Sequence, residues 1–104
     1  MMAYITLNNF QVAEDQAEGF EQRWRQRRSR LQGVPGFESF RLLRGETSDG
    51  AVHYASHITW ASREAFEAWM HSDHFVQAHR GDPLPKGMVL SHPRLQCFDV
   101  VLEN

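Results

Sequence analysis

The order of the predicted elements indicates an α+β fold of the ferredoxin-like, split βαβ kind, in which an antiparallel sheet carries two helices on one face. Three observations lead to this prediction. The hydrophobic patterns follow the order strand, helix, strand, strand, helix, strand. The chain has 104 residues, which suits one domain with a modest core. Its apolar share of 41% and its charged share of 23% are ordinary for a globular domain, so we expect a single domain over residues 1–104.

The first strand is predicted over Ala3 to Val12, where side chains alternate between two faces. One face carries Tyr4, Thr6, Asn8, Phe10 and Val12, and the other carries Ile5, Leu7, Asn9 and Gln11. Asparagine is a poor strand former, so the adjacent pair Asn8 and Asn9 weakens this strand. A functional role for at least one of them and a plain position at a sheet edge explain the pair equally well.

A long helix is predicted over Glu14 to Gln32 from its three-four apolar spacing, and it ends at Gly33. Its stripe contains Ala17, Phe20, Trp24, Arg27, Arg28 and Leu31. Arginines also crowd this region, at positions 23, 25, 27, 28 and 30. The formal net charge of the chain is −2, which argues against a nucleic-acid partner or an anionic membrane surface. We therefore interpret the arginine run as the solvated face of a helix.

A hairpin is predicted next, with strands over Phe37 to Arg44 and Ala51 to Trp60 and a polar turn over Gly45 to Gly50. In the second of these strands the apolar face carries Val52, Tyr54, Ser56, Ile58 and Trp60. His53 and His57 share the opposite face, but the sequence offers no third ligand that would make a metal site there.

The stretch from Ser62 to His79 predicts an amphipathic helix followed by a shorter one. Ser62 is a good N-cap, and the apolar stripe of the first helix contains Ala65, Phe66, Trp69 and Met70. The run from His71 to Asp73 interrupts the pattern. One face of the short second helix carries Phe75, Val76 and His79.

The segment from Arg80 to Pro93 has no clear period, and we expect a mobile loop with a functional role. A last strand is predicted over Arg94 to Glu103. Several apolar side chains on the strands need cover, namely Phe10, Tyr54, Ile58, Trp60 and Phe98. We expect a second copy of the chain to cover them, giving a homodimer whose sheets pack face to face into a barrel-like core.

A lone histidine on a helix is more often a satisfied surface or core residue than a ligand, and Trp69 by itself is typical of a core. His79 stands out because it closes a short helix just before a segment that contains Gly and Pro. Neutral imidazole is a good ligand for heme iron, and a single histidine leaves the opposite side of the iron open. His71 and His74 flank the same region but fit exposed helix-end positions better.

Three motifs together resemble the IsdG-type heme-degrading monooxygenases of the antibiotic biosynthesis monooxygenase superfamily. They are N-N-F at Asn8 to Phe10, W-x-S-R-E-A-F-E-A-W from Trp60 to Trp69, and S-D-x-F-x-x-A-H from Ser72 to His79. Shorter pieces resemble the rhizobial-type heme oxygenase branch: P-G-F at 35–37, L-L-R-G at 42–45, Y-A-S-H at 54–57 and H-P at 92–93. The resemblance covers essentially the whole chain.

The resemblance implies roles for individual residues. His79 would bind the heme iron, with Phe75 beside it. Asn8 would donate a hydrogen bond on the other side of the iron, and Trp69 would press on the porphyrin and distort it. The family has one asparagine before a basic residue, whereas Asn8 is followed by Asn9. Asn8 is chosen because Phe10 then follows by two residues, although a shift by one residue would reverse the face.

The resemblance also implies the activity. Heme would be both cofactor and substrate, opened at a meso carbon with O2 to a linear, biliverdin-like tetrapyrrole with release of iron. Electrons would come from a separate reductase or reductant, because the chain has no flavin or nicotinamide fingerprint. Two alternatives remain: a cofactor-free monooxygenase of the same superfamily acting on a polyphenolic or quinone-like molecule, and a heme-binding protein without catalysis.

The cellular setting is predicted from simple counts. The single cysteine, Cys97, cannot form an internal disulfide and reads as a half-buried strand thiol. The chain has no apolar run of membrane-spanning length and no pattern typical of a signal peptide. We therefore expect a cytoplasmic protein without a membrane partner.

Overall fold

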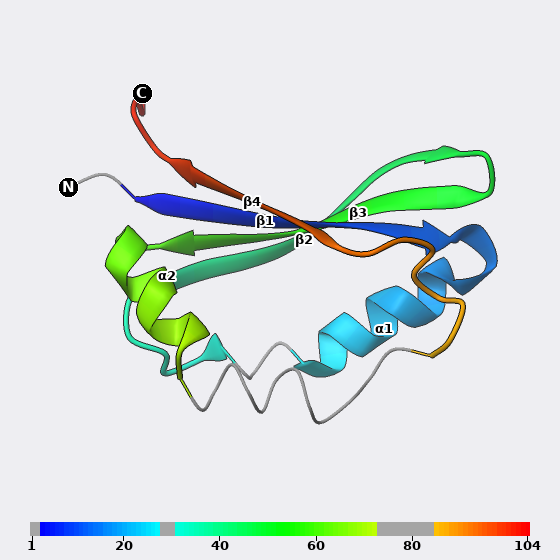
Figure 1. Cartoon of the computed structure of the whole chain (residues 1–104), viewed down its shortest axis with the longest axis horizontal. Helices are drawn as coiled ribbons and strands as arrows, with labels where there is room; N and C mark the ends of the chain where they lie inside the picture. Colours follow the sequence, from blue (N-terminus) through cyan, green and yellow to red (C-terminus); the bar gives the residue numbers. More distant parts are fainter. Residues whose placement is uncertain (1–2, 28–30, 73–84) are drawn as a thin grey trace.

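The computed structural model describes residues 3–27, 31–72 and 85–104. Its elements in chain order are β1 (Tyr4–Ala13), the 3-10 turn η1 (Glu14–Gln16), α1 (Ala17–Arg27), β2 (Phe37–Ser48), β3 (Ala51–Trp60), α2 (Arg63–Met70) and β4 (Arg94–Asp99). The strands form one sheet in the order β2-β3-β1-β4, and every neighbouring pair is antiparallel. Both helices lie on the same face of this sheet (Figure 1). The expected ferredoxin-like α+β fold is therefore confirmed.

The central pair β1 and β3 fixes which side chains meet the helices. Its register runs without a break from the pair Tyr4 and Trp60 to the pair Ala13 and Ala51. Because side chains alternate along a strand, the even-numbered residues of β1 and β3 share the face that the helices cover. In β4, Leu95 is the partner of Asn8, so this covered face also extends to the edge of the sheet.

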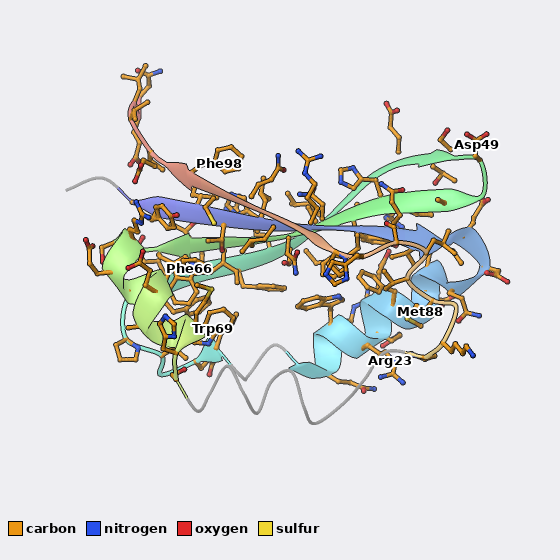
Figure 2. The ribbon with its side chains drawn as sticks, in the orientation of Figure 1. Arg23, Asp49, Phe66, Trp69, Met88 and Phe98 are labelled. Atoms are coloured by element: carbon orange, nitrogen blue, oxygen red, sulfur yellow. The ribbon has the colours of Figure 1, made fainter. Side chains whose placement is uncertain are left out.

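Two apolar cores fill the space under the helices. The first, which we call the α1 core, contains Phe10, Val12, Phe20, Val52, Tyr54 and Met88. The second, the α2 core, contains Tyr4, Val34, Ile58, Trp60 and Phe66. Figure 2 shows Met88 beside α1 and Phe66 beneath the opposite half of the sheet. The covered face of the sheet is thus divided between two helices, each of which packs on its own aromatic cluster.

The hairpin differs from the prediction. Strand β2 continues to Ser48, and only Asp49 and Gly50 form the turn, with φ values of 53° and 77°. Positive φ at both central residues is the geometry of a tight two-residue hairpin, for which Asp-Gly is a preferred sequence. An irregularity in pairing between Arg44 and Thr47 allows the polar segment to remain in the ladder. The predicted six-residue turn at Gly45 to Gly50 was therefore too long.

The ends of three other elements also differ. The first helical region starts as a 3-10 turn at Glu14, its described α-helix is Ala17–Arg27, and Gln32, the predicted end, lies in a turn. Strand β4 ends at Asp99 instead of Glu103. The second short helix expected before His79 lies outside the described residues.

The described part of the expected mobile loop is attached to the sheet. Val89 bridges Val12, and the backbone N–H of Ala13 donates to the carbonyl of Met88 at 2.9 Å. Met88 itself is buried in the α1 core. Residues 85–93 thus form a loop, as expected, and an apolar anchor and backbone hydrogen bonds attach it to the sheet.

The prediction of what the uncovered face carries also needs correction. Phe10, Tyr54 and Trp60 lie under the helices and are buried there, as is Ile58. Of the five apolar residues expected to need a second copy, only Phe98 points away from the helices (Figure 2). The sequence pattern showed that these residues share faces, but it did not show which face the helices cover. Cys97 is exposed rather than half-buried.

Candidate functional site

A row of four paired residues crosses the sheet between the two cores; its two central members are polar, and we call it the polar row. It consists of Leu95 on β4, Asn8 on β1, Ser56 on β3 and Leu42 on β2, joined by register pairing. On β1, Asn8 follows Thr6 on the side of the α2 core and precedes Phe10 in the α1 core. The two polar members, Asn8 and Ser56, therefore lie on the helix-covered face between the two cores, and we call them the polar floor.

Asn8 and Asn9 are separated by strand alternation. Asn9 lies on the uncovered face, where its Nδ2 donates to the carbonyl of Arg94 at 3.1 Å and to Gln96 Oε1 at 2.9 Å. Its Oδ1 pairs with His53 Nε2 at 3.0 Å. The amide of Asn8 takes part in no side-chain hydrogen bond between described residues and is half-buried on the helix side. Asn8 is thus the asparagine whose amide is available to a ligand.

Trp69 occupies the last turn of α2. The helix begins after Ser62, whose Oγ accepts a hydrogen bond from the backbone N–H of Ala65 at 3.1 Å. From there the three-four spacing turns Phe66 and Trp69 towards the sheet (Figure 2). The Trp69 ring lies 5.4 Å from the ring of Trp60 and remains half-buried. It is therefore a packing residue of the α2 core that keeps part of its ring surface exposed.

A close approach of two backbones sets the position of α2. Gly36 has a φ of +80°, and a Cβ at this position would lie 2.3 Å from the Cβ of Ala65. The carbonyl of Gly36 also accepts from the N–H of Ala61 at 2.8 Å. Glycine is required here both for its φ and for the contact. This contact fixes the start of α2, and with it the position of Trp69 at the other end.

Trp24 covers the β2 end of the polar row. Its ring stacks on Phe40 at 5.4 Å with an interplanar angle of 22°, and its edge meets Phe10 at 5.9 Å. Phe40 and Phe10 lie in the two rows of paired residues that flank the row of Leu42. The Trp24 indole, which contacts both, therefore lies across the Leu42 end of the polar row. The sequence pattern placed Trp24 in the helix stripe but gave no sign that it would flank the site. Ser56 was likewise missed, because a serine in a strand gives no functional signal of its own.

An ionic network lies at the edge formed by α1 and β2. Glu21 Oε2 accepts from the hydroxyl of Tyr54 at 2.5 Å and lies 3.2 Å from Arg44 Nη1, while Arg25 approaches Oε1 at 3.5 Å. Burial, followed by the hydrogen bond and the negative charge of Glu21, raises the pKa of Tyr54 to about 12. These residues line a groove of about 780 Å³ that also includes Trp24 and Phe40. The tyrosine is therefore held as a neutral donor at physiological pH.

Metal-binding side chains do not gather in the described residues: no group of three or more His, Cys, Asp or Glu that could hold a metal ion is found in them. His53 is bound to Asn9, and His57 has a buried Nδ1 without a partner on the uncovered face. The predicted iron ligand His79 and its neighbour Phe75 both lie outside the described residues. Of the predicted site residues, the structure thus places Asn8 and Trp69, on the same face of the sheet.

Two relatives found by sequence comparison carry one description. A mycobilin-producing heme oxygenase of Mycobacterium tuberculosis is 29% identical over 104 residues, which cover 98% of this chain and 92% of that protein. The same description and values hold for the protein of a second strain. The aligned region thus spans nearly the full length of both proteins.

Comparison with solved structures gives the same fold. MhuD, a heme-degrader from M. tuberculosis with two hemes bound in its active site, superposes with a TM-score of 0.77 at 28% identity, covering 97% of this chain and 98% of that one. SnoaB, a cofactor-independent oxygenase from Streptomyces nogalater, gives a TM-score of 0.72 at 19% identity, covering 99% and 97%. The second likeness concerns the fold alone.

The family itself follows from a match to a family model. The model of the antibiotic biosynthesis monooxygenases matches residues 3–81, which include β1, α1, β2, β3 and α2 and hence the polar floor and Trp69. The match covers well over half of the chain. This protein therefore belongs to the antibiotic biosynthesis monooxygenase family.

Proposed function

We propose that this chain is a heme-degrading monooxygenase that binds heme between its helices and its sheet and opens the porphyrin with O2 and external electrons. The product is a linear, biliverdin-like tetrapyrrole, and iron is released. The observation that carries the proposal is the Asn8 amide on the covered face of the sheet, which has no side-chain hydrogen-bond partner among the described residues and lies beside the aromatic wall that ends in Trp69. The 29% identity to a mycobilin-producing heme oxygenase over 98% of the chain supports it.

The residues that the structure describes fit such a ligand. A porphyrin is flat and largely apolar, so it needs aromatic and aliphatic walls with a few polar groups at its centre. The two cores supply aromatic walls on either side of the polar floor, with Trp24 from α1 and Trp69 from α2. Asn8 and Ser56 supply the polar centre. Leu95, which is half-exposed at the β4 end of the same row, adds apolar surface.

Each residue has a defined task in this proposal. Heme supplies the redox chemistry at its iron, and the protein orients it and sets the field around the reacting atoms. Asn8 Nδ2 donates a hydrogen bond where negative charge develops, which is most effective in a site shielded from water. The Trp69 indole, backed by Trp60, presses against the macrocycle and favours a distorted ring. His79 holds the iron from the other side, with Phe75 next to it.

The partners follow from the same chemistry. We propose a separate reductase or reductant as the electron donor, and a homodimer formed through the uncovered face of the sheet. The net charge of −2 gives no basis for a nucleic-acid partner. A cytoplasmic location remains a prediction from the sequence. Among the described residues, no helix has the length and apolar character that a membrane crossing requires.

The test is a hemin titration followed by visible absorption, with the wild type, His79→Ala and the matched control His71→Ala. His71 caps the exposed end of α2, so its loss leaves the proposed ligand in place. We expect a saturable Soret band that His79→Ala loses and His71→Ala keeps. Ascorbate in air, with catalase present, then converts the band to the spectrum of a linear tetrapyrrole. A band that survives reductant indicates a heme carrier without catalysis.

A second candidate is a cofactor-free monooxygenase acting on a polyphenolic or quinone-like molecule. It is favoured by the polar floor itself, because Asn8 and Ser56 between tryptophans can hold a flat hydroxylated ring without any metal. No Soret band in the wild type would contradict the heme proposal and select this candidate.

A further inference from the structure

Ser56 lies in the middle of the sheet face that the helices cover. It is the register partner of Asn8 across β1 and β3, and of Leu42 across β3 and β2. Directly opposed residues of an antiparallel pair have Cβ atoms about 4.5–5.5 Å apart, so the hydroxyl and the Asn8 amide serve the same small volume. On the same face of β3, the residues two positions away are Tyr54 and Ile58, which are both large and buried. A small polar side chain between these two large residues of β3 therefore needs an explanation.

Two polar side chains are buried among the described residues, Thr6 at 3% exposure and Ser56 at 5%. The burial of Thr6 is explained, because its Oγ1 accepts a hydrogen bond from Trp60 Nε1 at 3.2 Å. Ser56 takes part in no side-chain hydrogen bond between described residues. Ser56 Oγ is not among the fully buried polar atoms without a partner, which in the described residues are represented by His57 Nδ1, so the serine hydroxyl is not sealed in the core and can meet a ligand above the sheet.

We infer that Ser56 is a second hydrogen-bonding group of the site and acts with Asn8 on the ligand held against the polar floor. The inference rests on the proposed function and extends it to a residue to which the family resemblance assigns no role. A serine hydroxyl both donates and accepts, whereas the Nδ2 of Asn8 only donates. Ser56 therefore holds a small anionic or polar ligand at the centre of the site, on the side of the iron that Asn8 faces.

Ser56→Thr and Ser56→Val are a matched pair of variants, because threonine and valine have nearly the same shape and only threonine carries a hydroxyl. Both full-length proteins are loaded with hemin and titrated with azide, an anion that binds ferric iron. Loss of one hydrogen bond to a charged ligand predicts about tenfold weaker azide binding in Ser56→Val than in Ser56→Thr. Asn8→Leu, which removes the neighbouring donor, weakens azide binding as a positive control.

A second readout does not depend on turnover. After reduction with dithionite under carbon monoxide, the C–O stretching frequency is measured by infrared spectroscopy. A nearby donor lowers this frequency, so it is higher in Ser56→Val than in Ser56→Thr, which matches the wild type. Hemin affinity is measured for both variants first, so that each is fully loaded before azide or carbon monoxide is added. If Ser56→Val does not fold, Ser56→Ala is compared with the wild type in the same two measurements.

The outcomes separate this inference from the function on which it rests. Equal azide affinity and equal C–O stretching frequency in the matched pair overturn the role of Ser56, while saturable hemin binding leaves the proposed function intact. A wild type that binds no hemin overturns both. A difference between the fully hemin-loaded variants in both readouts supports the direct contact of Ser56 with the ligand.

Discussion

The neighbours Asn8 and Asn9 have the same side chain but opposite environments. Strand alternation turns Asn8 towards the helices and Asn9 towards the uncovered face. The amide of Asn9 joins three strands, because it bonds to Gln96 and the Arg94 carbonyl on β4 and to His53 on β3. Its hydrogen bonds favour the observed register of the sheet, and hence the orientation of Asn8. The presence of two poor strand formers is thus explained, because Asn9 stabilises the sheet and Asn8 serves the site.

This division predicts opposite effects of two alanine substitutions. Asn9→Ala removes three hydrogen bonds and lowers the free energy of unfolding by about 1–2 kcal/mol, with hemin turnover largely kept. Asn8→Ala changes the free energy of unfolding by less than about 0.5 kcal/mol. It slows hemin degradation by about 10²-fold, as removal of a single preorganised donor does in other enzymes. Urea denaturation and single-turnover absorption measure the two effects. Loss of turnover in Asn9→Ala alone would reverse the assignment.

Tyr54 predicts a dependence of stability on alkaline pH. Its pKa is raised from the ordinary value of 10.0 to about 12, so the folded state holds the phenolic proton more tightly than the unfolded state. The stabilisation is fully present below the unfolded pKa and is lost as pH rises through the folded pKa, between about pH 10 and about pH 12. Tyr54→Phe lacks this hydrogen bond to Glu21, so the difference in the free energy of unfolding between wild type and variant narrows over that window. Urea denaturation at several pH values measures it, and a constant difference up to pH 12 would contradict it.

At the residue scale, the sequence predicted what depends on alternation and spacing. The faces of β1 and β3, and the position of Trp69 on the inner side of α2, follow from periods of 2 and 3.6 residues. Trp24 and Ser56 were missed because their importance comes from long-range pairing, which brings β1, β3 and α1 together. The roles of Phe75 and His79 remain predictions, since both lie outside the described residues.

Among the elements, α2 depends most on a single contact. The turn at Gly36 and the first turn of α2 touch through Ala65, and the Ser62 cap starts the helix. Trp69 lies at the far end of this short helix, so a shift at Gly36 is transmitted to the wall of the site. The sequence predicted the cap and the stripe, which are local. It did not predict this contact, because the partner comes from a distant part of the chain.

Two glycine substitutions isolate that contact. Gly33 and Gly36 have similar positive φ values of +84° and +80°, but a Cβ at Gly33 meets nothing within 4 Å. Gly33→Ala therefore carries the backbone strain alone, about 1 kcal/mol. Gly36→Ala adds a severe overlap with Ala65 and lowers the free energy of unfolding by about 2–4 kcal/mol. Urea denaturation followed by tryptophan fluorescence measures both. Equal losses in the two variants would mean that α2 moves away from the turn at no cost.

The whole molecule has one covered and one uncovered sheet face (Figure 1). On the uncovered face lie the register neighbours Leu43, Ala55 and Asn9, and at the edge strand Phe98 pairs with Ile5. Leu43 is 42% exposed and Phe98 44%. The sequence predicted a homodimer, but it assigned to this face four residues that the helices bury. The remaining apolar surface is smaller and includes polar groups, such as the network around Asn9.

The homodimer is therefore predicted to depend on the few apolar side chains that remain outside. A charge placed in a buried apolar interface has no partner and strongly opposes association. Phe98→Asp and Leu43→Asp are expected to shift the protein from twice the monomer mass to the monomer mass in sedimentation velocity at micromolar concentration. Leu90→Asp is the matched control, because Leu90 is 54% exposed but follows the Val89 bridge beyond the sheet strands. If the sheets do not meet, all three variants sediment like the wild type. If the wild type is itself monomeric at every concentration, the uncovered face does not bind a second copy, and its exposed Leu43 and Phe98 are simply tolerated at the surface.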